Sequence, residues 1–202
     1  QPQRMLVAHT QGASLSTSGG EDWRLLAGIP GPVQYAYFSR AGESGNRAMF
    51  VVTPQTVFRS RGEGGHWQAV NGPWGAKTVV GFAASSGVED ARTLLYLWLA
   101  EANGAAAIWV SGDEGTAWHK AADFRTDQSV PGDPGLYWGH LLANDTNRNT
   151  LYAVKKYYGP ADSVWRSDDQ GRTWRPVAFS DRREARCNMA PDYINLLFKS
   201  VG

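Results

Sequence analysis

The segment 123–135, DFRTDQSVPGDPG, contains the side chains of this sequence best suited to acid–base chemistry. Asp127 and Asp133 lie close together in it, and paired carboxylates can act as acid and base in glycoside hydrolysis when their separation is right. In a loop rich in Pro and Gly, an Asp more often caps a turn of its own backbone. The turn-capping interpretation is therefore favoured, and catalysis by Asp127 and Asp133 is kept as the alternative.

A second stretch, residues 167–174 with the sequence SDDQGRTW, gathers carboxylates, a glycine, an arginine and a tryptophan, and it recurs along the chain. Residues 111–118 (SGDEGTAW) keep its Ser, Asp, Gly and Trp, and residues 60–67 (SRGEGGHW) and 16–23 (STSGGEDW) keep Ser, Gly and Trp. The copies are spaced by about 50 residues, which indicates one supersecondary unit per copy. The repeated positions are Ser16, Gly20, Trp23, Ser60, Gly64, Trp67, Ser111, Asp113, Gly115, Trp118, Ser167, Asp169, Gly171 and Trp174.

These repeated positions are interpreted as structural. An Asp two residues after the serine can accept hydrogen bonds from backbone N–H groups of its own turn. The glycine two positions later permits a positive φ where the chain reverses, and the tryptophan begins the next strand. Asp113 and Asp169 are therefore expected to form turns rather than to catalyse a reaction.

The elements that must carry these turns are strands. In each unit, short apolar runs recur about every ten residues between Gly, Asn, Asp or Pro, a pattern typical of antiparallel strands. Four strands per unit is the number in a propeller blade. We therefore predict an all-β chain with one domain over residues 1–202, a β-propeller of four-stranded antiparallel blades. The blades are expected at approximately 4–26, 33–70, 78–121 and 136–178, with 193–201 completing the first blade and closing the ring.

The template Ser-x-Asp-x-Gly-x-Thr-Trp resembles the Asp-box, or BNR repeat, of sialidases, xyloglucan-specific glucanases, sortilin-type receptors and photosystem II stability/assembly factors. All four units match, although the first two lack the aspartate and Ala117 replaces the threonine of the third. The resemblance implies a β-propeller whose box turns lie on the face opposite the active site. It does not imply one activity, because members share the repeat and differ in chemistry. Such propellers usually have six or more blades, so four blades form either a small closed ring or part of a larger one.

The resemblance to sialidases would imply an Arg-Ile-Pro element and a Tyr paired with a Glu. Here Gly28 precedes Ile29-Pro30, and no glutamate lies near Tyr157 and Tyr158 in the sequence. Xyloglucanase-like action would need two catalytic aspartates in a cleft between two propellers. A non-enzymatic function is therefore favoured. The alternative is a glycoside hydrolase, sialidase-like or xyloglucanase-like, complete or fragmentary.

Aromatic and cationic side chains in the predicted loops are the candidates for binding. Flat aromatic faces stack on sugars or anchor protein interfaces, and the locally basic segment 181–186, DRREAR, could meet an acidic partner. The candidates are Trp74, Trp138, Tyr157, Tyr158, Arg182 and Arg183. Packing between blades is the competing interpretation, and it is preferred for Trp138. The predicted function is that of a binding, assembly or stabilising accessory subunit, whose partner is a protein, a protein complex or a glycan surface.

Charge and composition narrow the partners. The formal net charge is +1, so no overall field draws the chain to nucleic acid, and no apolar run is long enough to span a bilayer. With the single Cys187 and four histidines without ligand spacing, no metal and no cofactor are expected. The chain begins at Gln1, which suggests a trimmed chain or a mature product without its signal, and Asn144–Thr146 is a glycosylation sequon. An extracytoplasmic location, secreted, periplasmic or at the cell surface, is therefore expected.

Overall fold

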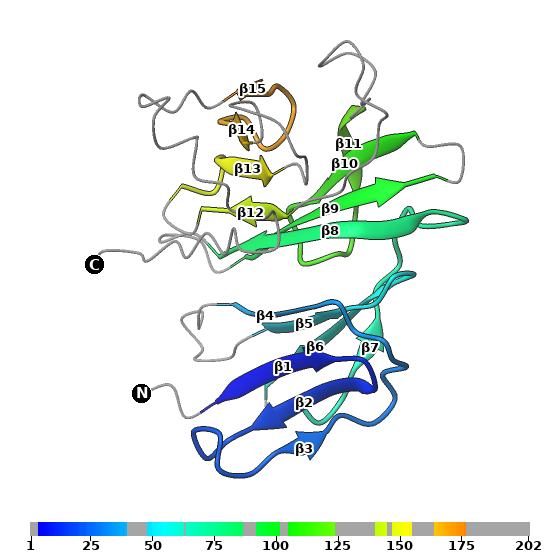
Figure 1. The fold of residues 1–202 in the computed structure, drawn as a ribbon, viewed down its shortest axis with the longest axis vertical. Coiled ribbons are helices and arrows are strands. Elements are labelled where there is room, and N and C mark those ends of the chain that lie inside the picture. The colour runs from blue at the N-terminus through cyan, green and yellow to red at the C-terminus, as the bar shows by residue number, and fades with distance from the viewer. Residues whose placement is uncertain are drawn as a thin grey trace, which may run out of the picture.

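The structure is a computed structural model that describes residues 4–39, 48–62, 64–86, 92–101, 105–123, 140–144, 147–154 and 164–176. In these ranges the chain forms strands arranged in four antiparallel sheets (Figure 1). None of the described segments forms a helix with the length and apolar character needed to cross a bilayer.

Each sheet is one unit of the repeat, and we name the sheets blades A to D in chain order. Their strands follow one another in sequence, so that each blade is a meander. Blade A contains β1 (Met5–His9), β2 (Gly12–Ser16) and β3 (Arg24–Leu25), and blade B contains β4 (Tyr35–Phe38), β5 (Ala48–Val52), β6 (Val57–Arg61) and β7 (Gln68–Ala69). Blade C contains β8 (Thr78–Ser85), β9 (Leu94–Ala100), β10 (Ala106–Ser111) and β11 (His119–Asp123), and blade D contains β12 (Leu141–Ala143), β13 (Leu151–Val154), β14 (Val164–Ser167) and β15 (Arg175–Pro176).

The all-β fold and the four-stranded blades predicted from the repeats are confirmed for blades B, C and D. Blade A has three strands among the described residues. The segment 193–201, predicted to supply its fourth strand, lies outside the described residues, so that closure stays a prediction, as does the single domain over 1–202. Within the described part, the four blades do not close into a ring.

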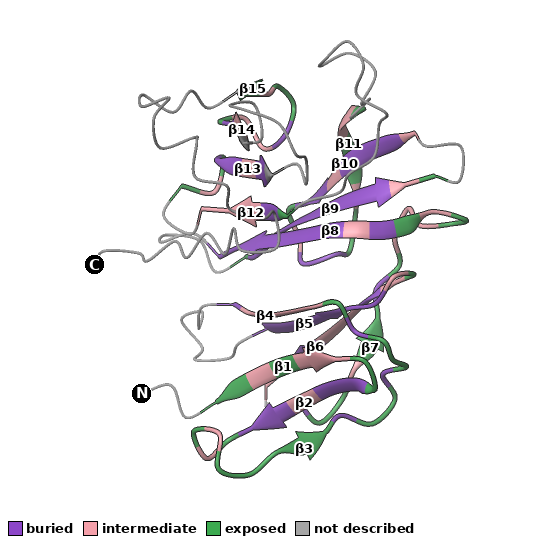
Figure 2. Ribbon diagram, in the orientation of Figure 1, coloured by how far each residue is buried: buried purple, intermediate pink, exposed green. Residues whose placement is uncertain are grey.

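Three clusters of buried apolar side chains hold the blades face to face, one between each consecutive pair. The run LLYLWLA of β9 shows how the sequence specifies this packing. Leu95, Leu97 and Leu99 point toward blade B, whereas Tyr96 and Trp98 point toward blade D, and all are buried. Because blade C is covered on both faces, its central strand is apolar throughout instead of alternating (Figure 2).

The inner strands bring successive blades together. Strand β1 contacts β4, and β8 contacts β12. Tyr35 and Tyr37 of β4 also reach across to β8 with their hydroxyl groups. Blades A and D lie at opposite ends of the resulting arrangement (Figure 1).

Candidate functional site

The box turn at 167–174 is held by a network centred on two side chains. Ser167 Oγ accepts a hydrogen bond from the N–H of Gly171 at 2.8 Å and donates one to Asp169 Oδ1 at 2.8 Å. Asp169 Oδ1 also accepts from the N–H groups of Arg172 and Thr173 at 3.0 and 2.9 Å. Its Oδ2 accepts from the Thr173 hydroxyl at 2.6 Å. The carboxylate is therefore engaged within its own turn.

The turn at 111–118 repeats this network with two contacts fewer, because the N–H of Thr116 donates to the Asp113 main-chain carbonyl instead of to its carboxylate. Ser111 Oγ accepts from the N–H of Gly115 at 2.7 Å and donates to Asp113 Oδ1 at 2.8 Å. Asp113 Oδ1 also accepts from the N–H of Ala117 at 2.8 Å. Because alanine has no hydroxyl, Asp113 lacks the side-chain contact that Thr173 gives to Asp169.

The first two copies lack the aspartate, and their serines differ from each other in their hydrogen bonds. Ser16 Oγ still accepts from the N–H of Gly20 at 2.9 Å. The buried Ser60 Oγ has no hydrogen-bond partner among the described residues. The second copy thus keeps the box serine, but this serine lacks the hydrogen bond that the serines of the other three copies accept from their box glycines.

The box glycine is needed for both conformation and space. Gly115 and Gly171 have φ angles of 92° and 86°, in the region that side chains disfavour. A Cβ on Gly115 would approach Val70 Cγ1 of the preceding blade to 2.5 Å. A Cβ on Gly171 would approach Ile108 of the preceding blade to 3.1 Å. Each turn is therefore pressed against the neighbouring blade at its glycine.

The box tryptophans lie at the same junctions. Trp67, Trp118 and Trp174 each pack against the buried cluster that joins their own blade to the preceding one. The indole N–H groups of Trp67 and Trp174 donate to the carbonyls of Gly64 and Gly171. The box therefore shapes a turn and at the same time fastens one blade to the next.

The electrostatics of the box carboxylates suit a turn and not an acid catalyst. Partial burial raises the pKa of Asp113 and of Asp169, but the hydrogen bonds that they accept outweigh it, and both pKa values are lowered. A general acid in glycoside hydrolysis needs a raised pKa. Both groups therefore stay charged and hold their turns.

Other described carboxylates form ion pairs. The Glu114 carboxylate meets Arg61 at 2.6 Å, and Asp123 meets Lys120 at 2.8 Å. Asp168 meets Arg166 at 2.6 Å, and hydrogen bonds from this guanidinium lower the pKa of the Asp168 carboxyl. Among the described residues, no group of three or more His, Cys, Asp or Glu side chains is placed to hold a metal ion.

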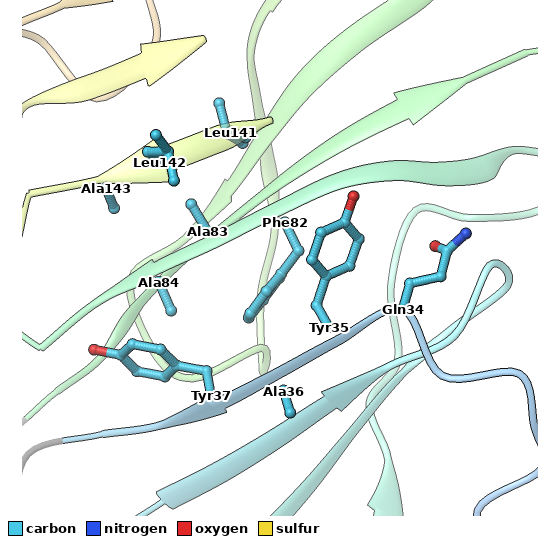
Figure 3. A pocket seen from close by; sticks show the side chains of 10 residues that line it. All are labelled: Gln34, Tyr35, Ala36, Tyr37, Phe82, Ala83, Ala84, Leu141, Leu142 and Ala143. Atoms are coloured by element: carbon cyan, nitrogen blue, oxygen red, sulfur yellow. The ribbon is translucent and has the colours of Figure 1, made fainter. Parts of the chain in front are cut away.

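The described residues also form a pocket, of about 430 Å³, where the inner strands of blades B, C and D meet (Figure 3). Strands β4, β8 and β12 each line it, so its walls come from three repeat units. Among the described residues that line it, none has a charged side chain. The lining residues are Gln34, Tyr35, Ala36, Tyr37, Phe82, Ala83, Ala84, Leu141, Leu142 and Ala143.

Hydrogen bonds fix the two tyrosines of this inner-strand pocket. The Tyr35 hydroxyl donates to the Val80 carbonyl at 3.1 Å, and the Tyr37 hydroxyl lies 3.0 Å from Ser86 Oγ. The Tyr35 ring packs at 45° to Phe82, with 6.1 Å between centroids. Burial raises the pKa of Tyr35, so this phenol stays neutral. The aromatic rings are thus held in place as neutral surfaces.

The binding residues predicted from the sequence lie in expected loops, and none of them belongs to this pocket. A signal was present in YAYF at 35–38, where Tyr35 and Tyr37 share one side of a strand. That signal alone could not identify a pocket, because the other walls come from strands about 50 and 100 residues away in a chain folded into blades.

The predicted binding residue Trp74 lies at the junction of blades B and C. Its ring meets Trp118 edge-on, with centroids 5.7 Å apart and an interplanar angle of 66°. It is half-buried and packs against the cluster between these blades. The other predicted binding and catalytic residues lie outside the described residues: Asp127, Asp133, Trp138, Tyr157, Tyr158, Arg182 and Arg183.

Comparisons with known proteins bear on the fold. No family model matches the chain. A xyloglucanase of Hypocrea jecorina (strain QM6a) is 31% identical over 107 residues, which cover 49% of this chain and 12% of the xyloglucanase. The structure of an ancestral GH74 enzyme superposes with a TM-score of 0.62 at 20% identity, covering 90% of this chain and 23% of that enzyme. YCF48 from Cyanidioschyzon merolae superposes with a TM-score of 0.51 at 13% identity, covering 87% of this chain and 56% of YCF48.

The chain therefore spans less than two thirds of each of these proteins. At the identities of the two solved structures, the likeness establishes the fold and leaves the activity open. The blade topology and the structural likeness agree, so the chain has a β-propeller fold whose turns carry the Asp-box pattern.

Proposed function

We propose that this chain is a non-enzymatic, exported binding module, which docks as an accessory subunit onto a protein complex or a glycan surface. The observation that carries the proposal is the inner-strand pocket. It combines aromatic rings, an amide and small apolar side chains, and none of the described residues that line it is charged. Sites of this composition bind neutral ligands by stacking and a few directed hydrogen bonds.

The placement of the described carboxylates supports a binding function over a catalytic one. Asp113 and Asp169 are engaged in their turns, and Asp168 and Glu114 are paired with arginines. Glycoside hydrolysis needs two carboxyl groups with different pKa values on either side of a bound sugar. Within the part of the chain that the structure describes, no residue that lines the inner-strand pocket carries a carboxylate.

A neutral glycan is the first ligand to test, because pyranose rings stack on tyrosine and phenylalanine faces and hydrogen-bond to amides. Binding of xyloglucan oligosaccharides is measured by calorimetry for the chain and for two pocket variants, Gln34→Ala and Ala36→Trp. Gln55→Ala, on the exposed turn between β5 and β6, is the matched control. We expect the pocket variants to weaken binding by about tenfold or more and the control to leave it unchanged. Equal binding by all four proteins would overturn the assignment of this pocket.

A second candidate is supported by one observation, the 31% identity to a xyloglucanase over about half of the chain. In this alternative, the chain is a complete or fragmentary glycoside hydrolase that uses Asp127 and Asp133. Release of reducing ends from xyloglucan, and hydrolysis of fluorogenic sialosides and β-glucosides, are the assays. Turnover that disappears in Asp133→Asn would replace the binding proposal with this one.

The proposed export is supported by the sequon at 144–146. Expression through a eukaryotic secretory pathway should give a chain that loses mass on enzymatic deglycosylation, and Asn144→Gln should abolish that loss. An unglycosylated secreted chain would remove the support that the sequon gives.

A further inference from the structure

One face of blade A is apolar and exposed. The large hydrophobic side chains that stand out to solvent in the described part of the chain are Met5 (43% exposed), Val7 (41%), Trp23 (44%) and Leu25 (58%). Met5 and Val7 lie on β1 and Leu25 on β3, and Trp23 precedes β3. Figure 2 shows exposed positions on both strands. We call these four residues the blade A face.

The strand register shows which face this is. Met5 pairs with the box serine of its blade, as Met49, Leu95 and Leu151 pair with theirs. Those three equivalents are 1%, 0% and 0% exposed, because each packs against the preceding blade. Blade A therefore carries the side chains of a blade-to-blade junction, and none of the described blades covers them.

The box tryptophan leads to the same conclusion. Trp23 donates its indole N–H to the Gly20 carbonyl at 3.0 Å, as Trp67 and Trp174 do with their own box glycines. The latter two pack on the preceding blade, whereas Trp23 is 44% exposed. The box turn of blade A thus has the same internal hydrogen bond, but its tryptophan does not pack against another described blade.

Blade D carries the opposite half of such a junction. Between blades B and C, Arg59, which directly precedes a box serine, donates to the carbonyl of Glu114 at 2.9 Å. Arg166 directly precedes the box serine of blade D and stands over the Tyr152 ring, 5.7 Å from its centroid. In blade A, the box position equivalent to Glu114 is Gly19, which also has a positive φ. Arg166 and the Gly19 carbonyl therefore correspond to the pair that joins blades B and C.

Arg166 already donates to Asp168, but its guanidinium has five N–H groups and can serve a further acceptor. Blade A and blade D of one chain lie at opposite ends of the structure (Figure 1), so blade D does not cover the blade A face of its own chain. A second copy supplies the same blade D without any rearrangement of the blades.

We propose that the blade A face binds blade D of a second copy of this chain, with Arg166 of one copy donating to the Gly19 carbonyl of the other. Because Arg166 of each copy meets Gly19 of the other, two copies related by a two-fold axis satisfy both junctions and close one ring. The proposal concerns a different surface from the inner-strand pocket, and it stands whether or not that pocket binds a glycan.

Light scattering coupled to size-exclusion chromatography tests the proposal at micromolar concentration. The wild-type chain should elute with twice the mass of the 22.1 kDa chain. Leu25→Glu and Val7→Glu place a charge on the blade A face and should raise the dissociation constant by about tenfold or more. Leu25 is exposed enough for its substitution to leave the blade folded, and an unchanged circular dichroism spectrum verifies this. Gln55→Glu adds the same charge elsewhere and should leave the dimer intact.

Mixing experiments distinguish this arrangement from one in which two blade A faces meet. Arg166→Glu should also raise the dissociation constant of the dimer, because it changes the surface of blade D that meets the blade A face of the other copy. A mixture of Leu25→Glu and Arg166→Glu retains one intact junction, so a heterodimer should form. A monomeric wild-type chain, a dimer that Leu25→Glu leaves unchanged, or an Arg166→Glu chain that dimerises as the wild type does would each overturn the proposal.

Discussion

The substitution Gly115→Ala separates the two tasks assigned to the box turn, bending the chain and fastening it to the preceding blade. Gly115 has a φ of 92°, and an added Cβ would lie 2.5 Å from Val70 Cγ1. Gly28 is the matched control, because its φ is 79° and an added Cβ would meet nothing within 4 Å. Alanine in a left-handed conformation costs about 1–2 kcal/mol at either position. At Gly115 the clash with a neighbouring blade adds about 1–3 kcal/mol.

Gly115→Ala should therefore lower the free energy of unfolding by about 2–5 kcal/mol, and Gly28→Ala by about 1–2 kcal/mol. Urea unfolding followed by tryptophan fluorescence measures both values. The double variant Gly115→Ala, Val70→Ala isolates the clash, because removing the Val70 methyl groups makes room for the new Cβ. Its unfolding free energy should exceed the sum expected from the single variants by about 1 kcal/mol or more. Equal losses for the two glycines, or strict additivity in the double variant, would refute the fastening role.

Three further predictions concern side chains around the boxes. Ser111→Ala removes the acceptor for the buried N–H of Gly115 and should lower the free energy of unfolding by about 1–3 kcal/mol, measured by chemical denaturation. Ser60→Ala loses no hydrogen bond to a described residue and should be nearly neutral. Equal losses for the two variants would contradict the hydrogen-bond network of the box. Asp169→Ala should cost about 1–2 kcal/mol at neutral pH, after allowance for solvent screening. The pKa of Asp169 in the folded chain lies below its ordinary value of 3.8, so the stability that its carboxylate contributes is present above pH 3.8 and is lost as the pH falls through the folded pKa. The difference in unfolding free energy between wild type and Asp169→Ala should therefore be smaller at pH 3 than at pH 7. A difference that grows toward acid would reverse the assigned sign. Arg61→Ala removes the partner of the carboxylate of Glu114, a residue that is only 9% exposed, so it should cost about 1–3 kcal/mol and keep most of that cost in molar salt. A cost below about 0.5 kcal/mol, the value typical of a fully exposed pair, would contradict a partly buried pair.

The strands and the turns could be predicted from the sequence because their signals are local. The box spacing identifies the turns, and the apolar runs between them identify the strands, since each run alternates or stays apolar according to the faces that its blade buries. The run LLYLWLA predicts a strand buried on both sides, and β9 is such a strand. Even the weakened copies at 16–23 and 60–67 could be placed, because their glycine and tryptophan stay in register with the complete copy.

The inner-strand pocket could not be predicted in the same way, because its walls come from three blades and depend on how these pack. Tyr35 in isolation is consistent with a core residue, and its contact with Phe82 exists only after blades B and C have joined. The different states of Ser60 and Ser111 are equally invisible in the sequence, because both serines begin a similar motif. Whether such a serine is bonded depends on the backbone that follows it, because Ser16 and Ser60 both lack the aspartate and only Ser16 accepts a hydrogen bond from its box glycine among the described residues.

We propose that this propeller binds a ligand in the inner-strand pocket and does not cleave it. The most direct test of this proposal is chromatography of xyloglucan oligosaccharides after prolonged incubation with the chain, at a concentration where calorimetry shows saturation. The account predicts saturable binding and recovery of intact oligosaccharides. Recovery of shortened products from the wild-type chain, and of intact oligosaccharides from Asp133→Asn, would contradict it.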